Sequence, residues 1–156
     1  MPRRRIERDR KGGYRLRLPV EERELLRTLP AQLREVLRDG DDPALRRLFP
    51  PAYADDAEAA DEFRRLMQDE LLEGKLAALR VVEETADAEH LSGEELEGWL
   101  GALESLRLYL GTQLDVREET YDLALDPNDP STPALALYGY LSWLQEQAVE
   151  ALSHGL

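Results

Sequence analysis

An apolar stripe between residues 96 and 114 constrains the fold of this chain more than any other feature. In the segment LEGWLGALESLRLYLGTQL, apolar side chains recur at alternating steps of three and four residues, which is the spacing of one helix face. The stripe consists of Leu96, Trp99, Leu103, Leu106 and Leu110. Because the apolar face of an isolated helix stays exposed to water, this helix requires other elements to pack against it.

Three further stripes can supply those partners. The first follows Pro19 and ends near Gly40, the second forms the longest helix and ends near residues 87–90, and the third follows residues 126–133. Their members are Leu26, Leu29, Leu33, Val36 and Leu37, then Phe63, Leu66, Met67, Leu72, Leu76, Leu79, Val82 and Ala86, then Leu137, Leu141, Leu144, Ala148 and Leu152. Pro30 interrupts the first stripe, and it predicts either a kink or a division into two short helices.

The first 18 residues predict a small basic β-hairpin. Gly12 and Gly13 can adopt positive φ in a turn, and the apolar side chains that follow alternate with arginines. Further along the chain, Ser92 and Glu95 have the spacing of a capping box, which predicts the start of the helix that carries Trp99.

Together these patterns predict a mainly α fold, a compact helical bundle of about four to six helices with a small N-terminal β-hairpin. The length of 156 residues fits a single domain over residues 1–156, with the hairpin at 1–18 and a helical body at 19–156. Proline-rich connectors are expected near 41–53 and 126–133. A short helical turn is expected at 44–48, and a short turn or helix is expected at 116–123.

The charge of the chain is divided unevenly. Residues 1–17 contain eight basic and two acidic side chains, a net charge of +6. Since the formal net charge of the whole chain is −13, residues 18–156 carry −19. A body this acidic repels phosphate backbones, so only the basic arm could contact nucleic acid. The candidate contacts of the arm with a partner or nucleic acid are Arg3, Arg4, Arg5, Arg8, Arg10, Lys11, Arg15 and Arg17.

Two arrangements of this arm are open. In the first, the arm has a purely structural role, and its positive charge lies across the acidic helical body or stays solvated. In the second, the arm contacts an acidic partner or nucleic acid. Arginine pairs well with carboxylates and phosphates. The sequence contains no recognisable helix-turn-helix, zinc-finger or RNA-binding aromatic motif that would read a base sequence.

No catalytic, cofactor-binding or metal-binding signature is present in the sequence. A chain without cysteine forms no disulfide, thiolate metal site or thiol switch. Glu83, Asp87 and His90 could share one helix face, but this set lacks the ligands of a di-iron bundle, and we expect a solvated His90 at a polar helix end. A calcium-binding loop starting at Asp126 lacks the required glycine and glutamate. We therefore expect no enzymatic activity, no cofactor and no metal ion.

Five residues are candidates for structural or interaction roles: Trp99, Arg107, Gln113, Trp143 and Gln145. The tryptophans can pack internally or line a partner surface, and leftover apolar surface on their helices could pair two copies of the chain as a homodimer. A buried arginine or glutamine must find a hydrogen-bond partner, because an unpaired buried polar group costs about 1 to 3 kcal/mol. We expect Arg107 to anchor its helix, for example to a carboxylate of a neighbouring helix.

Four segments of the chain carry a family resemblance. They are DPALRRLFPPAY (42–53), EFRRLMQDELLEGKLAAL (62–79), WLGALESLRLYLGTQL (99–114) and LYGYLSWLQEQAVEAL (137–152). The most specific parts combine apolar spacing with Arg107, Gly111, Thr112, Gln113 and Gln145 at matching places. These segments resemble the actinobacterial DUF2017 family, also called the AosR family, and with the hairpin and the helix that follows it the similarity covers nearly the whole chain.

The resemblance implies a helical, cytosolic, non-enzymatic protein that takes part in stress-linked transcriptional regulation through protein partners, such as a transcription factor or a sigma factor. Redox sensing by cysteine is associated with the regulator of that family, but this chain has no cysteine to carry a thiol switch. We therefore expect a cytoplasmic regulatory protein that acts through protein–protein interaction. The alternatives are a DNA-associated regulator that uses the basic arm and a small-molecule-binding helical bundle. No membrane partner is expected, because the longest apolar runs are far shorter than a membrane span.

Overall fold

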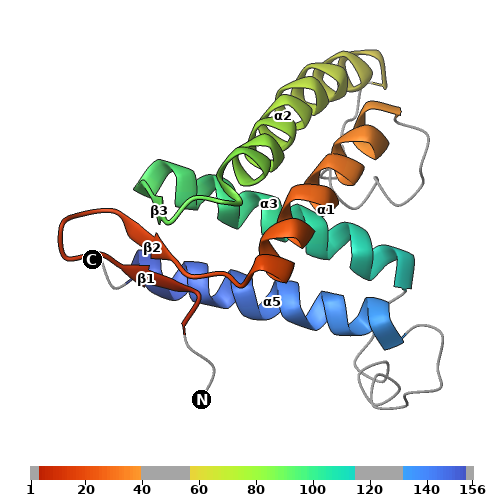
Figure 1. Ribbon diagram of the computed structural model, residues 1–156. Coiled ribbons are helices and arrows are strands. Elements are labelled where there is room, and N and C mark those ends of the chain that lie inside the picture. The colour runs from red at the N-terminus through yellow and green to blue at the C-terminus, as the bar shows by residue number, and fades with distance from the viewer. Residues whose placement is uncertain (1–3, 40–56, 115–131, 154–156) are drawn as a thin grey trace.

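Each of the four apolar stripes forms a helix (Figure 1). In chain order the helices are α1 (Val20–Asp39), α2 (Ala57–Thr85), α3 (Gly93–Leu114) and α5 (Thr132–Ser153). The computed structural model of the chain describes residues 4–39, 57–114 and 132–153, and for residues 39, 57–69, 113–114 and 132 it describes the backbone only. The expected connectors near 41–53 and 126–131, and the helical segments expected at 44–48 and 116–123, lie outside the described residues.

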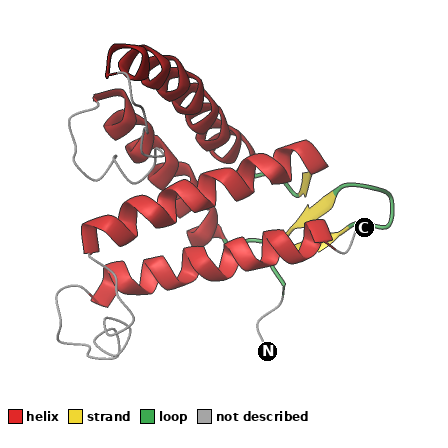
Figure 2. Ribbon diagram, turned by 180° about the vertical axis from the view of Figure 1, so that it is seen from behind, coloured by secondary structure: helices red, strands yellow, loops and turns green. Residues whose placement is uncertain are grey.

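Helices that follow one another along the chain pack against each other. α1 lies against α2, α2 against α3, and α3 against α5. Figures 1 and 2 show α3 and α5 side by side, with the α1–α2 pair set across them. The predicted mainly α fold with an N-terminal hairpin is therefore confirmed. No helix within the described ranges is both long and apolar enough to cross a membrane.

The core lies where the predicted stripes meet. Its most completely buried large side chains come from all four helices and include Leu26, Leu79, Val82, Leu96, Trp99, Leu103, Leu141 and Leu144. The stripe around Trp99 is buried from Leu96 to Leu106, while Leu110 is half-buried. Removal of this apolar surface from water supplies most of the driving force for folding, at roughly 25 cal/mol per Å².

A local signal sets the start of α3 as expected. The N–H of Glu95 donates to Ser92 Oγ at 3.0 Å, and the N–H of Ser92 donates to Glu95 Oε1 at 2.8 Å, so the capping box before α3 is confirmed. α5 begins at Thr132, so the last two residues of the loop expected over 126–133 belong to this helix. Pro133 then lies in the first turn, where a missing backbone N–H costs no intrahelical hydrogen bond.

Pro30 does not divide the first helix. α1 is one continuous helix from Val20 to Asp39 with Pro30 inside it, so the alternative of two short helices is wrong. The ring of Pro30 is among the fully buried side chains. Its apolar contacts, and those of the buried residues Leu26 and Leu33 on either side, offset the hydrogen bond that the proline removes.

The N-terminal hairpin belongs to a three-stranded antiparallel sheet. β1 (Ile6–Arg8) pairs with β2 (Tyr14–Leu16), and β2 pairs on its other side with β3 (His90–Leu91). Ile6 and Leu16 lie opposite each other and are both buried, and β1 contacts α5. One face of the sheet therefore packs on the helices, while the tip of the hairpin projects away from them (Figure 1).

The third strand corrects the prediction for His90. We expected α2 to reach residues 87–90 with His90 at its polar end, but α2 ends at Thr85 and His90 lies in β3, opposite Arg15. The helix ends at Thr85 because the backbone groups that follow form hydrogen bonds with β2. Leu16 N–H donates to the Glu89 carbonyl at 2.8 Å, so the free edge of β2 takes up the segment after α2.

Replacing Gly13 with alanine is expected to lower the free energy of unfolding by about 2 kcal/mol. Gly13 has a φ of +74°, and a Cβ there would lie 2.9 Å from the carbonyl oxygen of Leu91 in β3. The substitution therefore strains the turn and also pushes β3 away from β2. Urea unfolding followed by circular dichroism measures the loss.

Gly12→Ala is the matched control for this prediction. Gly12 also has a positive φ, of +96°, but a Cβ there would meet no atom of the described residues within 4 Å. Only the conformational strain then applies, and we expect a loss of about 1 kcal/mol. Equal losses for the two variants would refute the role of the Leu91 contact.

Candidate functional site

Arg5 ties the basic arm to the helical body. Its Nε and Nη2 donate to the two carboxylate oxygens of Glu22 in α1, at 3.1 and 3.0 Å. The guanidinium group also lies 5.4 Å from the ring centroid of Trp143 in α5, a cation–π distance. The hydrogen bond to Glu22 raises the pKa of Arg5 above its ordinary value. Arg5 is therefore a permanently charged link between the arm and two helices.

Glu22 is shared between the arm and α5. The hydroxyl group of Tyr140 donates a hydrogen bond to Glu22 Oε1 at 2.7 Å. Burial of the phenol and this hydrogen bond raise the pKa of Tyr140, so the hydroxyl stays neutral and remains a donor. The side chains of Arg5 and Glu22 are only 20% and 19% exposed. Loss of Glu22 would remove the carboxylate that pairs with this partly shielded guanidinium group.

Gln147 in α5 also holds the hairpin on the helices, through the backbone of β1 and of the residue before it. Its Oε1 accepts hydrogen bonds from the backbone N–H groups of Arg5 and Ile6, the second at 3.3 Å. Neither Glu22 nor Gln147 was identified from the sequence. A signal for Gln147 was present, because this residue is polar within the last apolar stripe and directly precedes the buried Ala148.

Two other arginines of the arm form weaker ion pairs. Arg17 Nη2 lies 3.6 Å from Glu7 Oε2 on the neighbouring strand, and Arg4 Nη2 lies 3.9 Å from Glu150 Oε2 in α5. All four side chains are more than a third exposed. Pairs of this kind contribute about 0 to 1 kcal/mol, so they neutralise charge without holding the arm in place.

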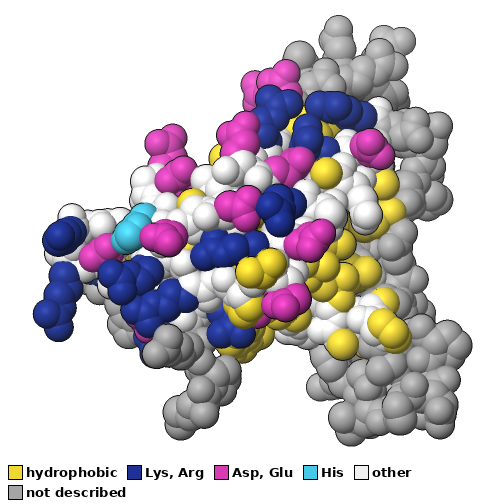
Figure 3. All heavy atoms as spheres, viewed as in Figure 1, with side chains coloured by type: hydrophobic (Ala, Val, Ile, Leu, Met, Phe, Trp, Pro, Cys, Tyr) yellow, Lys and Arg dark blue, Asp and Glu magenta, His cyan; other side chains and the backbone are white. Residues whose placement is uncertain are grey.

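The tip of the hairpin carries cations that point to solvent. We define the hairpin tip as Arg10, Lys11 and Arg15, which are exposed and form no salt bridge with the part of the chain that the structure describes. Figure 3 shows the lysine and arginine side chains gathered around the hairpin beside the histidine. Arg8 is also exposed, and Arg3 lies outside the described residues. The arm thus has a bound base and an exposed tip.

Asp9 supplies a carboxylate that shapes the turn at the tip. Its Oδ1 accepts the backbone N–H of Lys11 at 3.2 Å, and its Oδ2 lies 3.1 Å from His90 Nε2 in β3. The hydrogen bond from Lys11, and to a smaller extent the charges of His90 and Arg15, lower the pKa of Asp9. Asp9 therefore stays ionised at neutral pH, and its carboxylate is engaged by groups of the turn and of β3.

The two tryptophans occupy different environments. Trp99 is fully buried, and its indole N–H donates to Thr85 Oγ1 at 2.7 Å, so it packs internally and contributes no surface for a partner. Trp143 is half-buried, with Arg5 above its ring and Tyr140 at a centroid distance of 6.1 Å. The base of the hairpin therefore covers part of Trp143.

Arg107 joins α3 to α5. Its Nη1 donates to Gln145 Oε1 at 2.7 Å, and its guanidinium group lies 5.4 Å from the ring centroid of Tyr138. The hydrogen-bond partner is an amide where we had suggested a carboxylate. Gln113 lies at the end of α3, and its side chain is outside the described part of the structure.

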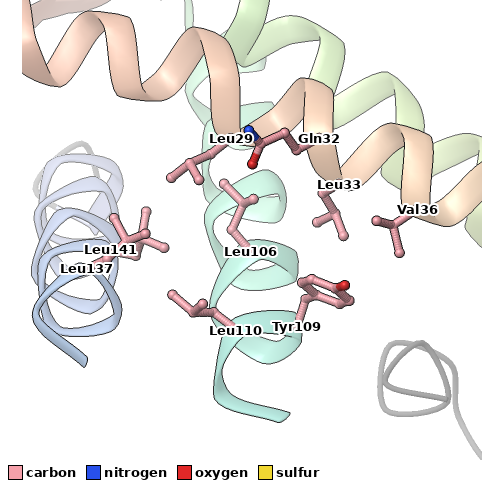
Figure 4. A pocket seen from close by; sticks show the side chains of 9 residues that line it. All are labelled: Leu29, Gln32, Leu33, Val36, Leu106, Tyr109, Leu110, Leu137 and Leu141. Atoms are coloured by element: carbon pink, nitrogen blue, oxygen red, sulfur yellow. The ribbon is translucent and has the colours of Figure 1, made fainter. Parts of the chain in front are cut away.

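An open apolar groove lies between α1, α3 and α5 (Figure 4). We call it the three-helix groove, and its volume is about 270 Å³. It is lined by Leu29, Gln32, Leu33 and Val36 of α1, Leu106, Tyr109 and Leu110 of α3, and Leu137 and Leu141 of α5. Leu33, Leu106 and Leu141 are buried and form its floor, while most of the other lining side chains are half-buried. Figure 3 shows hydrophobic side chains exposed together on this face.

The described residues offer no arrangement suited to metal chemistry. No group of three or more histidine, aspartate or glutamate side chains within those ranges could hold a metal ion. The arrangement at the surface is instead a cationic hairpin tip and an apolar groove, and both are suited to contact with another macromolecule.

Comparison with known families places both surfaces in one family domain. Residues 3–152 match the model of a family described as a domain of unknown function, DUF2017. The searches of curated proteins and of solved structures find no significant match. The matched range includes the hairpin tip and all residues that line the three-helix groove.

Proposed function

This chain belongs to the DUF2017 family, a domain of unknown function, and from its surfaces we propose that it is a non-enzymatic regulatory protein that acts by binding another protein. One observation carries the proposal. The three-helix groove brings half-buried apolar side chains from three helices into one open depression. Exposed apolar surface of this kind commonly marks a site of protein contact.

The lining of the groove favours a protein partner over a small molecule. Gln32 and Tyr109 are the polar lining residues, and the other seven are leucine or valine. The volume of about 270 Å³ is below the range of roughly 300 to 1,000 Å³ that is usual for small-molecule sites, which also place several polar groups around the ligand. One or two apolar side chains of a partner helix would fit this depression.

The resemblance to AosR-like proteins extends the proposal to stress-linked transcriptional regulation in the cytoplasm, with a transcription factor or a sigma factor as the partner. Thiol oxidation cannot provide the signal within this chain, because the chain contains no cysteine. The signal would then reach the protein through its partner or through a change in the amount of either protein.

A charge placed in the groove is expected to weaken partner binding. Leu110→Glu and Leu137→Glu each put a carboxylate on a half-buried lining position, where a partner's apolar side chain would have to desolvate it. The measurement is quantitative affinity capture from native lysate with the tagged full chain, compared protein by protein with the wild type. Proteins that bind through the groove are expected to be depleted at least about tenfold, the effect of roughly 1.4 kcal/mol.

Matched controls for this experiment lie on the same two helices. Leu108 in α3 and Val149 in α5 are apolar and exposed (39% and 44%), and neither lines the groove. Leu108→Glu and Val149→Glu should therefore retain the captured proteins, and circular dichroism verifies that all four variants are folded. The proposal fails if no protein is captured, or if the groove variants and the control variants retain it equally.

A further inference from the structure

We propose that the hairpin tip, formed by Arg10, Lys11 and Arg15, binds a short acidic segment of a partner protein through the carboxylates of that segment. The inference rests on the proposed function, because it names the chemistry of a protein partner. It concerns a surface separate from the three-helix groove, so the two can be tested independently.

The basic arm contains both cations that are paired within the chain and cations that are exposed. Arg4, Arg5 and Arg17 are paired with carboxylates of the chain itself. The three cations of the hairpin tip are exposed and have no such pair among the side chains that the structure describes, those of residues 4–38, 70–112 and 133–153, although residues 18–156 carry a net charge of −19. The nearby carboxylate of Asp9 is engaged by the Lys11 N–H and by His90, so the three exposed cations remain available to an external anion.

Hydrogen bonds hold the backbone under these cations in a closed turn. Asp9 N–H donates to the Gly13 carbonyl at 3.0 Å, and Gly12 N–H donates to the Asp9 carbonyl at 3.2 Å, which closes the turn. Arg15 lies in β2, the central strand, between β1 and β3. Gln147 and Glu22 hold the base of the hairpin on the helices. A partner therefore does not have to order the backbone of the tip when it binds.

The surroundings of the tip favour a peptide carboxylate over the phosphates of a nucleic acid. Guanidinium groups form two-pronged hydrogen bonds with carboxylates as well as with phosphates, so the tip by itself accepts either. A nucleic acid is a long polyanion, and its phosphates beyond the tip would approach the acidic helices. Tyr14, the aromatic residue of the hairpin, packs against the core and is not presented for base stacking. A short acidic peptide contacts the tip alone and avoids that repulsion.

The test measures fluorescence anisotropy of a labelled oligoglutamate peptide with the full chain. Reversal of the tip charges in the triple variant Arg10→Glu/Lys11→Glu/Arg15→Glu is expected to weaken peptide binding at least about tenfold. Binding by the wild type should also fall steeply as salt rises from about 0.1 to about 1 M, because the Debye length shortens from about 10 to about 3 Å.

The control variant is matched in net charge. Arg38→Glu/Lys75→Glu/Arg80→Glu makes the same change in charge on α1 and α2, away from the hairpin, and should retain most of the peptide affinity. Because Arg15→Glu would face Glu7 across the strands, the double variant Arg10→Glu/Lys11→Glu repeats the test with changes in the turn alone.

Three outcomes would overturn the inference. They are an absence of peptide binding by the wild type, equal weakening in the tip variant and the matched control, and tighter tip-dependent binding of a short DNA duplex than of the peptide. The third outcome would assign the tip to nucleic acid. Leu110→Glu and Leu137→Glu should leave peptide binding unchanged, so failure of the tip and failure of the groove are distinguishable.

Discussion

Replacing Arg23 with alanine is expected to lower the free energy of unfolding by about 3 kcal/mol. The guanidinium group donates hydrogen bonds to four backbone carbonyl oxygens, those of Leu16, Leu18, Ala86 and Ala88, at 2.7 to 3.2 Å. These acceptors lie in β2, in the link to α1 and in the segment after α2, so one side chain joins three segments. In the alanine variant, partly buried carbonyl groups lose their donors, and each such loss costs about 1 to 3 kcal/mol before water compensates in part.

Arg27→Ala provides the control for Arg23→Ala. Arg27 lies about one turn further along α1 and pairs with Asp87 at 2.7 Å, but the two side chains are 43% and 65% exposed. Its loss should cost less than about 0.5 kcal/mol. Arg23→Lys is expected to lose most of the stability that Arg23→Ala loses, because an ammonium group cannot reach carbonyl oxygens on so many sides. Urea unfolding gives the values, and equal losses for Arg23→Ala and Arg27→Ala would contradict the assigned role.

Trp99→Ala is expected to lower the free energy of unfolding by about 4 kcal/mol. Trp99 is fully buried between α2 and α3, and its indole N–H donates to Thr85 Oγ1 at 2.7 Å. The Thr85 hydroxyl donates in turn to the Val81 carbonyl, so both of its hydrogen-bonding roles are in use. The substitution leaves a large cavity and removes a donor, and core replacements of tryptophan by alanine cost about 3 to 5 kcal/mol.

Two further variants separate these contributions. Trp99→Phe keeps much of the apolar volume but loses the N–H, so its expected loss is about 2 kcal/mol. Trp143→Ala removes a half-buried ring beneath Arg5 and should cost less than Trp99→Ala. Urea unfolding followed by far-ultraviolet circular dichroism compares all three variants. A Trp99→Ala loss no larger than that of Trp143→Ala would show that the internal ring is not central to the core.

Features that depend on residues close in sequence were predictable. The spacing of the apolar stripes indicated the four helices, because a helix face repeats every three to four residues. Ser92 and Glu95 lie three residues apart, and the capping box they form needs no distant partner. Gly12 and Gly13 indicated the hairpin turn, and both have positive φ in the structure. Membership of the DUF2017 family was also recognisable from the helical segments.

Features that depend on distant contacts were not predictable. β3 is a strand because its backbone meets the free edge of β2, more than 70 residues earlier, and His90 has no local signal for that pairing. Composition alone could not show that the base of the basic arm is bound to the helices while the hairpin tip is exposed. Arg5 is held by Glu22 and Gln147, which lie 17 and 142 residues away, whereas Arg10 and Arg15 have no such partner within the described residues.

The fold class, the helix faces, the turn of the hairpin and the uneven charge all follow from residue type and local spacing, so they can be read from the sequence. Which cations stay exposed, and which apolar side chains remain outside the core, depends on how the folded elements pack. Leu110 and Leu137 belong to regular stripes like the buried leucines, yet they line an open groove. The physical reason is that burial depends on how three helices cross in space, and a periodic pattern records only which face of each helix is apolar.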